Sequence, residues 1–253
     1  MASWDDEQYL KFADERTRPA KELLLRVPVE KPHRVVDLGC GPGNSTELLT
    51  DRWPYAEVVG VDNSQEMLAR ARRDLPTVDF IEADAQTYRP EQPVDVLFAN
   101  ALLQWVPGHE QLLPELFGSV LPGGALAFQV PNNFDEPSHR LMRELKGSWS
   151  ERLAQVPARA QIGAPAFYYD LLAPHARHVD IWQTTYQHVM PDAQAIVAWV
   201  EGTGLRPYLD ALAGEERAAY LSAYTAAIDS AYPPRSDGKR LFSFPRLFVV
   251  AVR

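Results

Sequence analysis

A glycine-rich turn constrains the fold of this chain more than any other segment. An apolar run over residues 35–38 leads directly into the turn at residues 39–43, which has glycine at every second position, and a helical pattern begins at Asn44. Glycine adopts positive φ readily and lets a ligand approach the backbone closely. The amides of the turn and of the helix start can hold an anionic group. The segment therefore predicts a strand, a ligand-binding turn and a helix, in that order.

Short apolar runs and helical patterns alternate between Arg34 and Val130. The apolar runs cover residues 35–38, 58–61, 78–81, 94–99 and 125–130. The helical patterns between them cover residues 44–51, 65–74 and 109–121. A Pro-Gly-Gly sequence at residues 122–124 predicts a turn before the fifth run. Strand–helix alternation with unpatterned apolar strands predicts an α/β fold, in which helices cover both faces of a parallel sheet.

The remainder of the chain adds helices and two strands to this pattern. Residues 1–30 predict an opening helix that covers the ligand site, and prolines follow its end. Further helices are predicted over residues 138–155, 192–202 and 215–232, and further strands over residues 177–190 and 247–252. We expect a seven-stranded sheet with a core made of residues 31–134, 176–190 and 241–253. The helical insertions, residues 135–175 and 191–240, are expected to cap the carboxyl edge of the sheet, where open α/β sheets bind ligands.

Composition excludes several classes of protein. The net charge of −9 argues against nonspecific binding to nucleic acid or to anionic membranes. No apolar run approaches the roughly 20 residues that a membrane-spanning helix needs, and the acidic first residues lack the apolar core of a secretion signal. Cys40 is the single cysteine, so an internal disulfide and a cysteine-cluster zinc site are both excluded. We expect a cytoplasmic protein that is a monomer or a weak dimer.

The residues around the glycine turn indicate which ligand it binds. A nicotinamide-binding turn has the spacing G-x-G-x-x-G, whereas glycine recurs here at every second position of residues 39–43. Asp37 lies in the strand end, two residues before the first glycine. Recognition of a pyrophosphate gives no reason for a carboxylate there, but recognition of a cationic amino-acid group does. The turn therefore favours a ligand with an amino-acid portion over a dinucleotide.

Polar side chains also end the next three strands. Asp62 follows the turn by about 20 residues and is placed to accept hydrogen bonds from both hydroxyls of a ribose. Alternatively, Asp62 caps the next helix, a role that Asn63 and Ser64 could also fill. Asp84, after the third strand, is placed to accept from an adenine amino group, unless it is a solvated loop carboxylate. Residues 100–101, at the end of the fourth strand, are expected to face the amino-acid portion of the ligand.

These four features, in this order over residues 34–130, resemble those of the class I S-adenosylmethionine-dependent methyltransferases. The resemblance implies a Rossmann-like fold, a mostly parallel sheet with an antiparallel last strand, S-adenosylmethionine as methyl donor and S-adenosylhomocysteine as product. It implies a cofactor site at the carboxyl ends of the first four strands, formed by Asp37, Gly39, Cys40, Gly41, Asp62, Asn63, Met67, Asp84, Ala85, Asn100, Ala101 and Trp105. Cys40 is expected to be a small buried residue rather than a nucleophile, since no histidine is nearby in sequence.

Three arginines in unusual settings indicate an anionic methyl acceptor. Arg16 precedes Pro19 in the opening helix, Arg206 lies in a turn between helices, and Arg246 lies among aromatic residues at the last strand. Arginine pairs bidentately with carboxylates, and a carboxylate acceptor is already ionised and needs no general base. Each arginine is alternatively an exposed or salt-bridged residue. The histidines are scattered and form no catalytic dyad.

The whole chain also resembles the trans-aconitate 2-methyltransferase family. The likeness extends beyond the cofactor fold to residues 4–12, 15–20, 141–144, 179–186, 203–207 and 244–248. It implies methylation of one carboxylate of trans-aconitate, a small tricarboxylate, by positioning alone, without a catalytic residue or a metal ion. The expected substrate-binding residues are Tyr9, Arg16, Trp105, Tyr168, Tyr186, Arg206 and Arg246. The three arginines would hold carboxylates, Tyr9 and Trp105 would line the site, and one of the two other tyrosines would donate a hydrogen bond.

Several alternatives stay open. Trp105 is alternatively a core residue, and Tyr9 and Phe12 are alternatively the buried face of the opening helix. The acceptor is alternatively another small carboxylate, such as a thioester acid, because the fold does not fix the acceptor. A noncatalytic protein that binds S-adenosylmethionine is a further hypothesis. A nicotinamide-dependent dehydrogenase is disfavoured by the glycine spacing and by Asp37.

Overall fold

A computed structural model describes residues 13–157 and 161–253 of the chain. Two compact units are present. The sheet unit, as we name it, consists of Arg16–Pro131, Ala160–Thr184 and Arg246–Arg253. The helical unit includes Asn132–Arg159 and Thr185–Pro245. Among the described residues, no helix is both long and apolar enough to cross a membrane.

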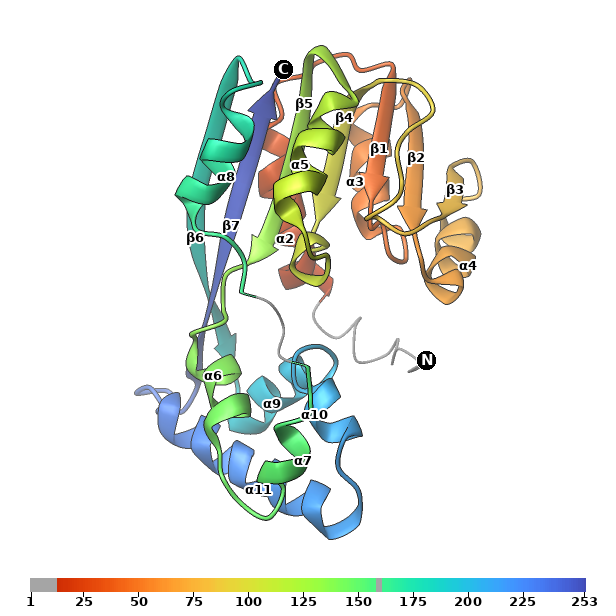
Figure 1. Cartoon of the computed structure of the whole chain (residues 1–253). Helices are drawn as coiled ribbons and strands as arrows, with labels where there is room; N and C mark the ends of the chain where they lie inside the picture. Colours follow the sequence, from red (N-terminus) through yellow and green to blue (C-terminus); the bar gives the residue numbers. More distant parts are fainter. Residues whose placement is uncertain (1–12, 158–160) are drawn as a thin grey trace. The chain divides into compact units, whose positions relative to one another are not determined.

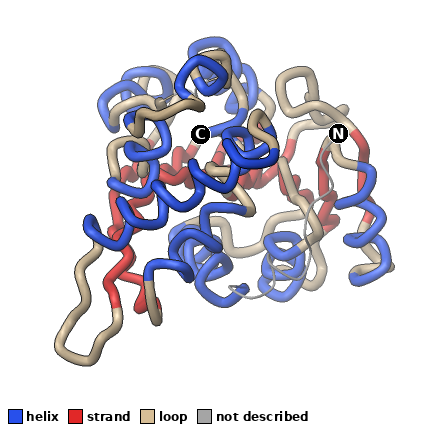
Figure 2. The backbone as a smooth tube through the Cα atoms, turned by 90° about the horizontal axis from the view of Figure 1, so that it is seen from below, coloured by secondary structure: helices blue, strands red, loops and turns tan. Residues whose placement is uncertain are grey.

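The strands form one seven-stranded sheet with the order β3-β2-β1-β4-β5-β7-β6, and they lie side by side in Figure 2. Their bounds are β1 (Arg34–Leu38), β2 (Glu57–Asp62), β3 (Asp79–Glu82), β4 (Val94–Asn100), β5 (Val120–Pro131), β6 (His178–Met190) and β7 (Arg240–Val252). The pairs β1–β2, β1–β4, β2–β3 and β4–β5 are parallel, and β5–β7 is antiparallel. The arrowhead of β7 accordingly points opposite to those of β1 and β2 in Figure 1. The predicted α/β sheet of seven strands with an antiparallel last strand is confirmed.

Helices cover the sheet on both faces. In the sheet unit they are α2 (Ala13–Arg26), α3 (Asn44–Arg52), α4 (Gln65–Asp74), the 3-10 helix η1 (Leu103–Trp105), α5 (His109–Gly118) and α8 (Pro165–Leu172). In Figure 1, α5 and α8 lie in front of the sheet and α2 and α3 lie behind it. The predicted helix over residues 65–74 has the bounds of α4, and that over residues 44–51 differs from α3 by one residue.

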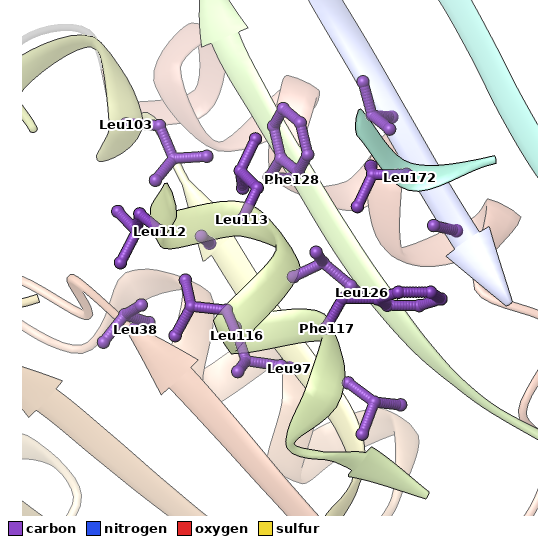
Figure 3. Packing of buried hydrophobic residues seen from close by; sticks show 14 of the residues in the cluster. Leu38, Leu97, Leu103, Leu112, Leu113, Leu116, Phe117, Leu126, Phe128 and Leu172 are labelled. Carbon is purple, nitrogen blue, oxygen red and sulfur yellow. The ribbon is translucent and has the colours of Figure 1, made fainter. Parts of the chain in front are cut away.

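The front face of the sheet holds a continuous apolar core (Figure 3). Leu113, Leu116 and Phe117 of α5 are at most 1% exposed, and they pack with Leu97 and Leu126 of the strands. Each such side chain contributes about 1.5–3 kcal/mol by leaving water. Alternate strand residues point to opposite faces, so Asp37, which lies between Val36 and Leu38 of this core, points to the α3 face.

The helical unit has a core of its own. Its helices are α6 (Pro137–Glu144), α7 (Ser150–Leu153), α9 (Ala193–Glu201), α10 (Arg206–Asp210) and α11 (Gly214–Ala231). Their apolar side chains pack with each other and with Phe242 and Phe244. The hydroxyls of Tyr224 and Tyr220 donate to the carbonyls of Ser138 (2.5 Å) and Met142 (3.1 Å), which holds α11 against α6.

Three sequence-based expectations about elements were wrong. The helix predicted over residues 138–155 is broken: α6 ends at Glu144, and the N–H of Gly147 donates to the Ser150 hydroxyl (2.9 Å) before α7 begins. The predicted turn at residues 122–124 lies inside β5, and α5 ends before it. Arg206 is the first residue of α10 rather than part of a turn. Helix α8 was not predicted.

Residues 122–124 lie in a strand rather than a turn because segments far away in sequence form backbone hydrogen bonds with this part of the chain. Val94 pairs with Val120 and Val96 pairs with Ala125, so β5 accommodates extra residues in an irregularity. The N–H of Gly123 donates to the carbonyl of Arg253 (2.8 Å). The predicted division into a cofactor-binding core and helical cap insertions assigns functions to these segments, and it stays a prediction.

Candidate active site

The order of the strands locates the candidate site. The chain passes from β1 to β2 and β3 on one side of the sheet, and then returns to β4 on the other side of β1. Ligands of open α/β sheets bind at the carboxyl ends of the strands beside such a switch. The glycine turn, Asp62, Asp84 and residues 100–101 all lie at this edge, because each follows or ends one of four parallel strands.

The glycine turn has the backbone conformation that only glycine adopts easily. Gly39, Gly41 and Gly43 have φ of 73°, 54° and 96°. A Cβ on Gly39 would lie 2.6 Å from Leu102 Cδ1, so packing requires this glycine. A Cβ on Gly41 would meet no described atom within 4 Å. The turn is thus packed on one side and leaves its backbone accessible at Gly41.

Asp37 is a fully buried carboxylate with one partnered and one unpartnered oxygen. Its Oδ2 accepts hydrogen bonds from the hydroxyls of Ser45 and Thr46, both at 2.7 Å. Its Oδ1 has no hydrogen-bond partner among the described residues. Burial raises the pKa of Asp37 to about 6, against the lowering by its two hydrogen bonds, and the nearby charge of Asp62 adds to the rise. A buried, half-partnered carboxylate fits an incoming cationic group, as the sequence predicted.

Asp62 braces the turn from the end of β2. Its Oδ2 accepts from the N–H of Gly41 (2.9 Å), and its Oδ1 accepts from the N–H of Ser64 (2.9 Å). The helix-cap alternative for Asp62 was wrong, because the Ser64 side chain caps α4 by accepting from the N–H of Met67. Each carboxylate oxygen retains acceptor capacity beyond one hydrogen bond, so both remain able to accept from a diol.

The other expected cofactor residues extend this edge. Asp84 is exposed, and its Oδ1 accepts from the N–H of Gln86 (2.8 Å), which fixes the carboxylate at the end of β3. Asn63 is exposed, Met67 is half-buried and Ala85 is buried. These positions are compatible with an adenosine group along β2 and β3, and their roles stay predictions.

Cys40 is a buried part of the turn, with 3% of its surface exposed. Burial, together with the charges of Asp37 and Asp62, raises the pKa of its thiol well above the ordinary value. A thiolate is therefore disfavoured here. This supports the expectation of a small buried residue and not a nucleophile.

Trp105 and Ala101 end the β4 side of the site. Trp105 is 54% exposed, so the alternative that it packs in the core was wrong. Ala101 has φ of 53°, the only positive φ of a non-glycine residue in the described chain. Its N–H donates to the carbonyl of Gln129 (3.0 Å). Strained residues of this kind cluster at ligand sites, which agrees with the predicted position of residues 100–101.

Arg246 is buried in the sheet unit, with 6% of its surface exposed. Its Nη1 donates to Gln129 Oε1 (2.9 Å), and Gln129 Nε2 donates to Asn100 Oδ1 (2.5 Å). Gln129 is fully buried and was not predicted as a site residue. The signal was present, because it is a lone amide in the otherwise apolar β5 segment at residues 125–130.

These polar side chains share one face of the sheet. Asn100 pairs with Gln129, and Asp37 pairs with Phe98, two residues before Asn100. Paired residues of neighbouring strands lie on the same face, as do alternate residues of one strand. We call Asp37, Asn100, Gln129 and Arg246 the polar row. It crosses β1, β4, β5 and β7, with a carboxylate at one end and a guanidinium at the other.

The remaining predicted substrate residues differ in their surroundings. Tyr168 is fully buried, and its hydroxyl contacts His109 Nδ1 (3.1 Å) and accepts from the N–H of Gly163 (3.2 Å). His109 Nε2 lies 2.9 Å from the carbonyl of Leu103, which can only accept, so Nε2 carries the proton and Tyr168 donates to Nδ1. This use of its only proton favours a structural role for Tyr168.

The helical unit contains two further candidates. Tyr186 is buried and stacks near His188. Arg206 begins α10, and its Nε lies 3.5 Å from Asp210 Oδ2. Arg16 lies in α2, but its side chain and all of Tyr9 and Phe12 fall outside what the structure describes.

Comparisons with known proteins agree with this geometry. Residues 35–124 match a family model described as a methyltransferase domain. A trans-aconitate 2-methyltransferase of Azoarcus sp. (strain BH72) is 64% identical over 253 residues, which is all of both chains. A trans-aconitate 2-methyltransferase of Methylobacterium radiotolerans is 56% identical, and the match covers 99% of this chain and 98% of that one.

A solved structure supports the fold. Phosphoethanolamine N-methyltransferase 2 of Haemonchus contortus, in complex with phosphomonomethylethanolamine and S-adenosylhomocysteine, superposes with a TM-score of 0.56 at 16% identity. The match covers 93% of this chain and 52% of that one. At this identity the likeness concerns the fold alone.

Proposed function

We propose a reaction for this chain from one premise: the chain belongs to the trans-aconitate 2-methyltransferase family of class I methyltransferases. The reaction is transfer of a methyl group from S-adenosylmethionine to one carboxylate of trans-aconitate. Its products are the monomethyl ester, (E)-3-(methoxycarbonyl)pent-2-enedioate, and S-adenosylhomocysteine. The observation that carries the acceptor is the 64% identity over the full length of both chains.

The residues of the glycine-turn edge fit the cofactor. The unpartnered Oδ1 of Asp37 would accept from the ammonium of its amino-acid portion, and the open backbone at Gly41 gives that portion room. Asp62 would accept from the ribose hydroxyls and Asp84 from the adenine amino group. When bound, S-adenosylmethionine supplies a methyl group activated by its sulfonium.

The chain's own contribution to the chemistry is positioning. A carboxylate acceptor is ionised at neutral pH, so no residue has to remove a proton from it. Arg16 and Arg246 would hold carboxylates of the acceptor and aim one of them at the methyl group, which replaces a bimolecular encounter by a fixed geometry. Trp105, exposed at the end of η1, would line the site.

Tyr168 is assigned no role in binding the acceptor, since its proton is used within the core. Tyr9, Tyr186 and Arg206 stay predictions from the sequence. Arg206 is the most directly testable of them, because its side chain is partly exposed and its pairing with Asp210 has a helical spacing that contributes little to stability.

Mass spectrometry of the products tests the reaction. Purified protein with trans-aconitate and S-adenosylmethionine should give a singly methylated ester and S-adenosylhomocysteine in equal amounts. Cis-aconitate, isocitrate and a malonyl thioester, offered separately, should react with lower kcat/KM. A higher kcat/KM with one of these compounds would identify that compound as the acceptor and would leave the reaction class unchanged. Binding of the cofactor without transfer to any of them would overturn the proposal.

Kinetics of an arginine variant test the acceptor site. Arg206→Ala should raise KM for trans-aconitate by about tenfold or more, as expected for a lost charged hydrogen bond, with KM for the cofactor nearly unchanged. Arg217→Ala, on an exposed position of α11, is the matched control and should keep both constants. Unchanged kinetics of Arg206→Ala would remove this residue from the site.

A further inference from the structure

The polar row has a direction that its donors and acceptors impose. A guanidinium only donates hydrogen bonds, so the amide end of Gln129 that faces Arg246 is the oxygen, at 2.9 Å. The other end of Gln129 is then its NH2 group, which only donates. Asn100 therefore turns its oxygen toward Gln129, at 2.5 Å. One arginine thus fixes the orientation of two amides in succession.

The fixed orientation determines what Asn100 offers to a ligand. Its oxygen is used by Gln129, so the end that it turns away from Gln129 is the Nδ2 amide group, which only donates. Asn100 is half-buried at the carboxyl end of β4, beside the strained Ala101. The backbone of Gln129 holds Ala101 as well, through the hydrogen bond to the Ala101 N–H at 3.0 Å. Gln129 therefore sets both a side chain and the backbone at this point of the site.

We propose that Gln129 is a positioning residue that presents Asn100 as a hydrogen-bond donor to a ligand carboxylate. The inference rests on the proposed function, because both proposed ligands carry carboxylates: the amino-acid portion of the cofactor and the acceptor. The hydrogen bonds that orient Asn100 are the same whichever of these two carboxylates binds there. Arg246 acts in this row through Gln129, in addition to any contact that its other N–H groups make.

An isosteric substitution reverses the row. In Gln129→Glu the side chain keeps its size and accepts from Arg246 as a buried ion pair, but it no longer donates to Asn100. The Asn100 amide then turns its NH2 toward the new carboxylate and its oxygen toward the ligand. The Asn100 oxygen and the ligand carboxylate would then face each other, and both only accept hydrogen bonds. In wild type the Asn100 NH2 donates to that carboxylate. Asn100→Asp removes the same donor directly and keeps the hydrogen bond from Gln129.

Calorimetry with two ligands measures the effect without turnover. We expect Gln129→Glu and Asn100→Asp each to weaken binding of S-adenosylhomocysteine by about 10- to 100-fold, the range for a charged hydrogen bond. Binding of the decarboxylated analogue, which lacks only the carboxylate, should stay within about twofold of wild type. A merely structural role of Gln129 would weaken both ligands alike. Gln111→Glu, an exposed position of α5, is the control for the added charge.

The acceptor provides the second arm of the experiment. If both variants instead bind S-adenosylhomocysteine normally and raise KM for trans-aconitate by about 10- to 100-fold, the carboxylate belongs to the acceptor and the proposal holds. Gln129→Met, which removes both hydrogen bonds without adding charge, replaces Gln129→Glu if that variant does not fold, and a smaller loss of the same kind is expected.

Besides equal weakening of both ligands, two further results would overturn the inference. One is a Gln129 variant that leaves both ligands and the acceptor KM unchanged while Asn100→Asp weakens binding, which removes the positioning role. The other is an Asn100→Asp variant with wild-type constants throughout. A wild-type protein that binds S-adenosylhomocysteine but does not methylate trans-aconitate would refute the proposed function only, because the calorimetric arm needs no acceptor.

Discussion

Asp37 is the residue at which stability and ligand binding oppose each other. Its pKa of about 6 in the folded chain lies above the ordinary 3.8 because burial disfavours the charged form. The folded state therefore binds its proton more tightly than the unfolded state does. Between about pH 4 and pH 6 the stabilisation by the protonated form is lost as pH rises. Above pH 6 the ligand-free fold contains a buried anion with one oxygen that no described residue partners.

Removing this charge should stabilise the ligand-free protein. For Asp37→Asn we expect an increase of about 1–3 kcal/mol in the free energy of unfolding at pH 8, from the size of the pKa shift, and almost none at pH 4. Urea titrations at both pH values measure it. The same variant should bind S-adenosylhomocysteine at least about 100-fold more weakly, as expected for a lost buried ion pair. A variant that is less stable than wild type at pH 8 contradicts this account of the pKa.

Cofactor binding should release a proton near pH 6. A cationic ammonium stabilises ionised Asp37, so binding requires deprotonation wherever the free site is protonated. The Kd for S-adenosylhomocysteine should rise about tenfold for each pH unit below 6 and level off above it. Calorimetry in buffers with different ionisation enthalpies detects the proton. A Kd that is constant from pH 5 to pH 8 would argue against Asp37 as the ammonium acceptor.

The sequence indicated the roles of some site residues but not of others. Asp37 and Asp62 were predictable because each lies within a few residues of the glycine turn or a strand end, where local sequence defines its setting. Gln129 stands out in the sequence as a lone amide in an apolar strand, but its role was not predictable, because its partner Arg246 is 117 residues away and Asn100 is 29 residues away. Only the pairing of β4, β5 and β7 brings the three together.

At the scale of elements, a substitution in the glycine turn should affect ligand binding more than it affects stability. Gly41 has φ of 54°, and a Cβ added to it would have no described atom within 4 Å. Gly41→Ala should therefore cost about 1–2 kcal/mol of stability for its left-handed backbone, but should weaken S-adenosylhomocysteine by more than about tenfold, because the methyl group occupies space that the ligand needs. Thermal unfolding and calorimetry measure the two effects.

Gly118→Ala serves as the control for that substitution. Gly118 also has no described atom within 4 Å of an added Cβ, but it ends α5 without a positive φ. It should keep ligand affinity and gain or lose less than about 1 kcal/mol. Equal losses of affinity in both variants would show that the open space at Gly41 has no special relation to the ligand.

The contact between α11 and α6 predicts a stability effect in the helical unit. Tyr224 is fully buried, burial raises its pKa far above the ordinary value, and its hydroxyl donates to the Ser138 carbonyl. Tyr224→Phe should lower the free energy of unfolding by about 1–2 kcal/mol, since a buried acceptor loses its partner. Tyr55→Phe, at a residue that is 99% exposed, should change it by less than about 0.5 kcal/mol. Urea titration gives both values, and equal effects would discount the buried hydrogen bond.

Elements were predictable where their signals are local. The bounds of α4 follow from Ser64, its capping residue, and from one apolar stripe. The break between α6 and α7 was missed because the apolar residues on both sides of it join one core, so the helical spacing continues through Gly147 in the sequence although the helix does not. The strand character of residues 122–124 depends on Arg253, which follows the end of β7.

At the scale of the whole molecule, ligand binding should appear as stability. A ligand that binds only the folded state adds about 2.7 kcal/mol to the free energy of unfolding at 100 times its Kd. S-adenosylhomocysteine should produce this shift in wild type, whereas Asp37→Asn at the same concentration should show almost none. Urea unfolding with and without ligand measures it. A shift of equal size in the two proteins would disconnect Asp37 from the binding.

The chain leaves and re-enters each of the two compact units, with boundaries after Pro131, Arg159, Thr184 and Pro245. Strands β6 and β7 each belong partly to both units. Local patterns identify the elements but give no information on which core an element joins.

The position of β7 has a consequence for how the protein comes into being. β7 follows β1, β4 and β5 in the chain, yet it pairs with β5 and supplies the guanidinium that orients Gln129 and, through it, Asn100. A nascent chain whose β7 is still within the ribosome contains the glycine turn, Asp37 and Asp62, but it lacks the guanidinium that fixes the orientation of the Gln129 and Asn100 amides. The polar row would therefore be completed only after β7 has been synthesised, and a product truncated before β7 would offer a ligand carboxylate no oriented donor at Asn100.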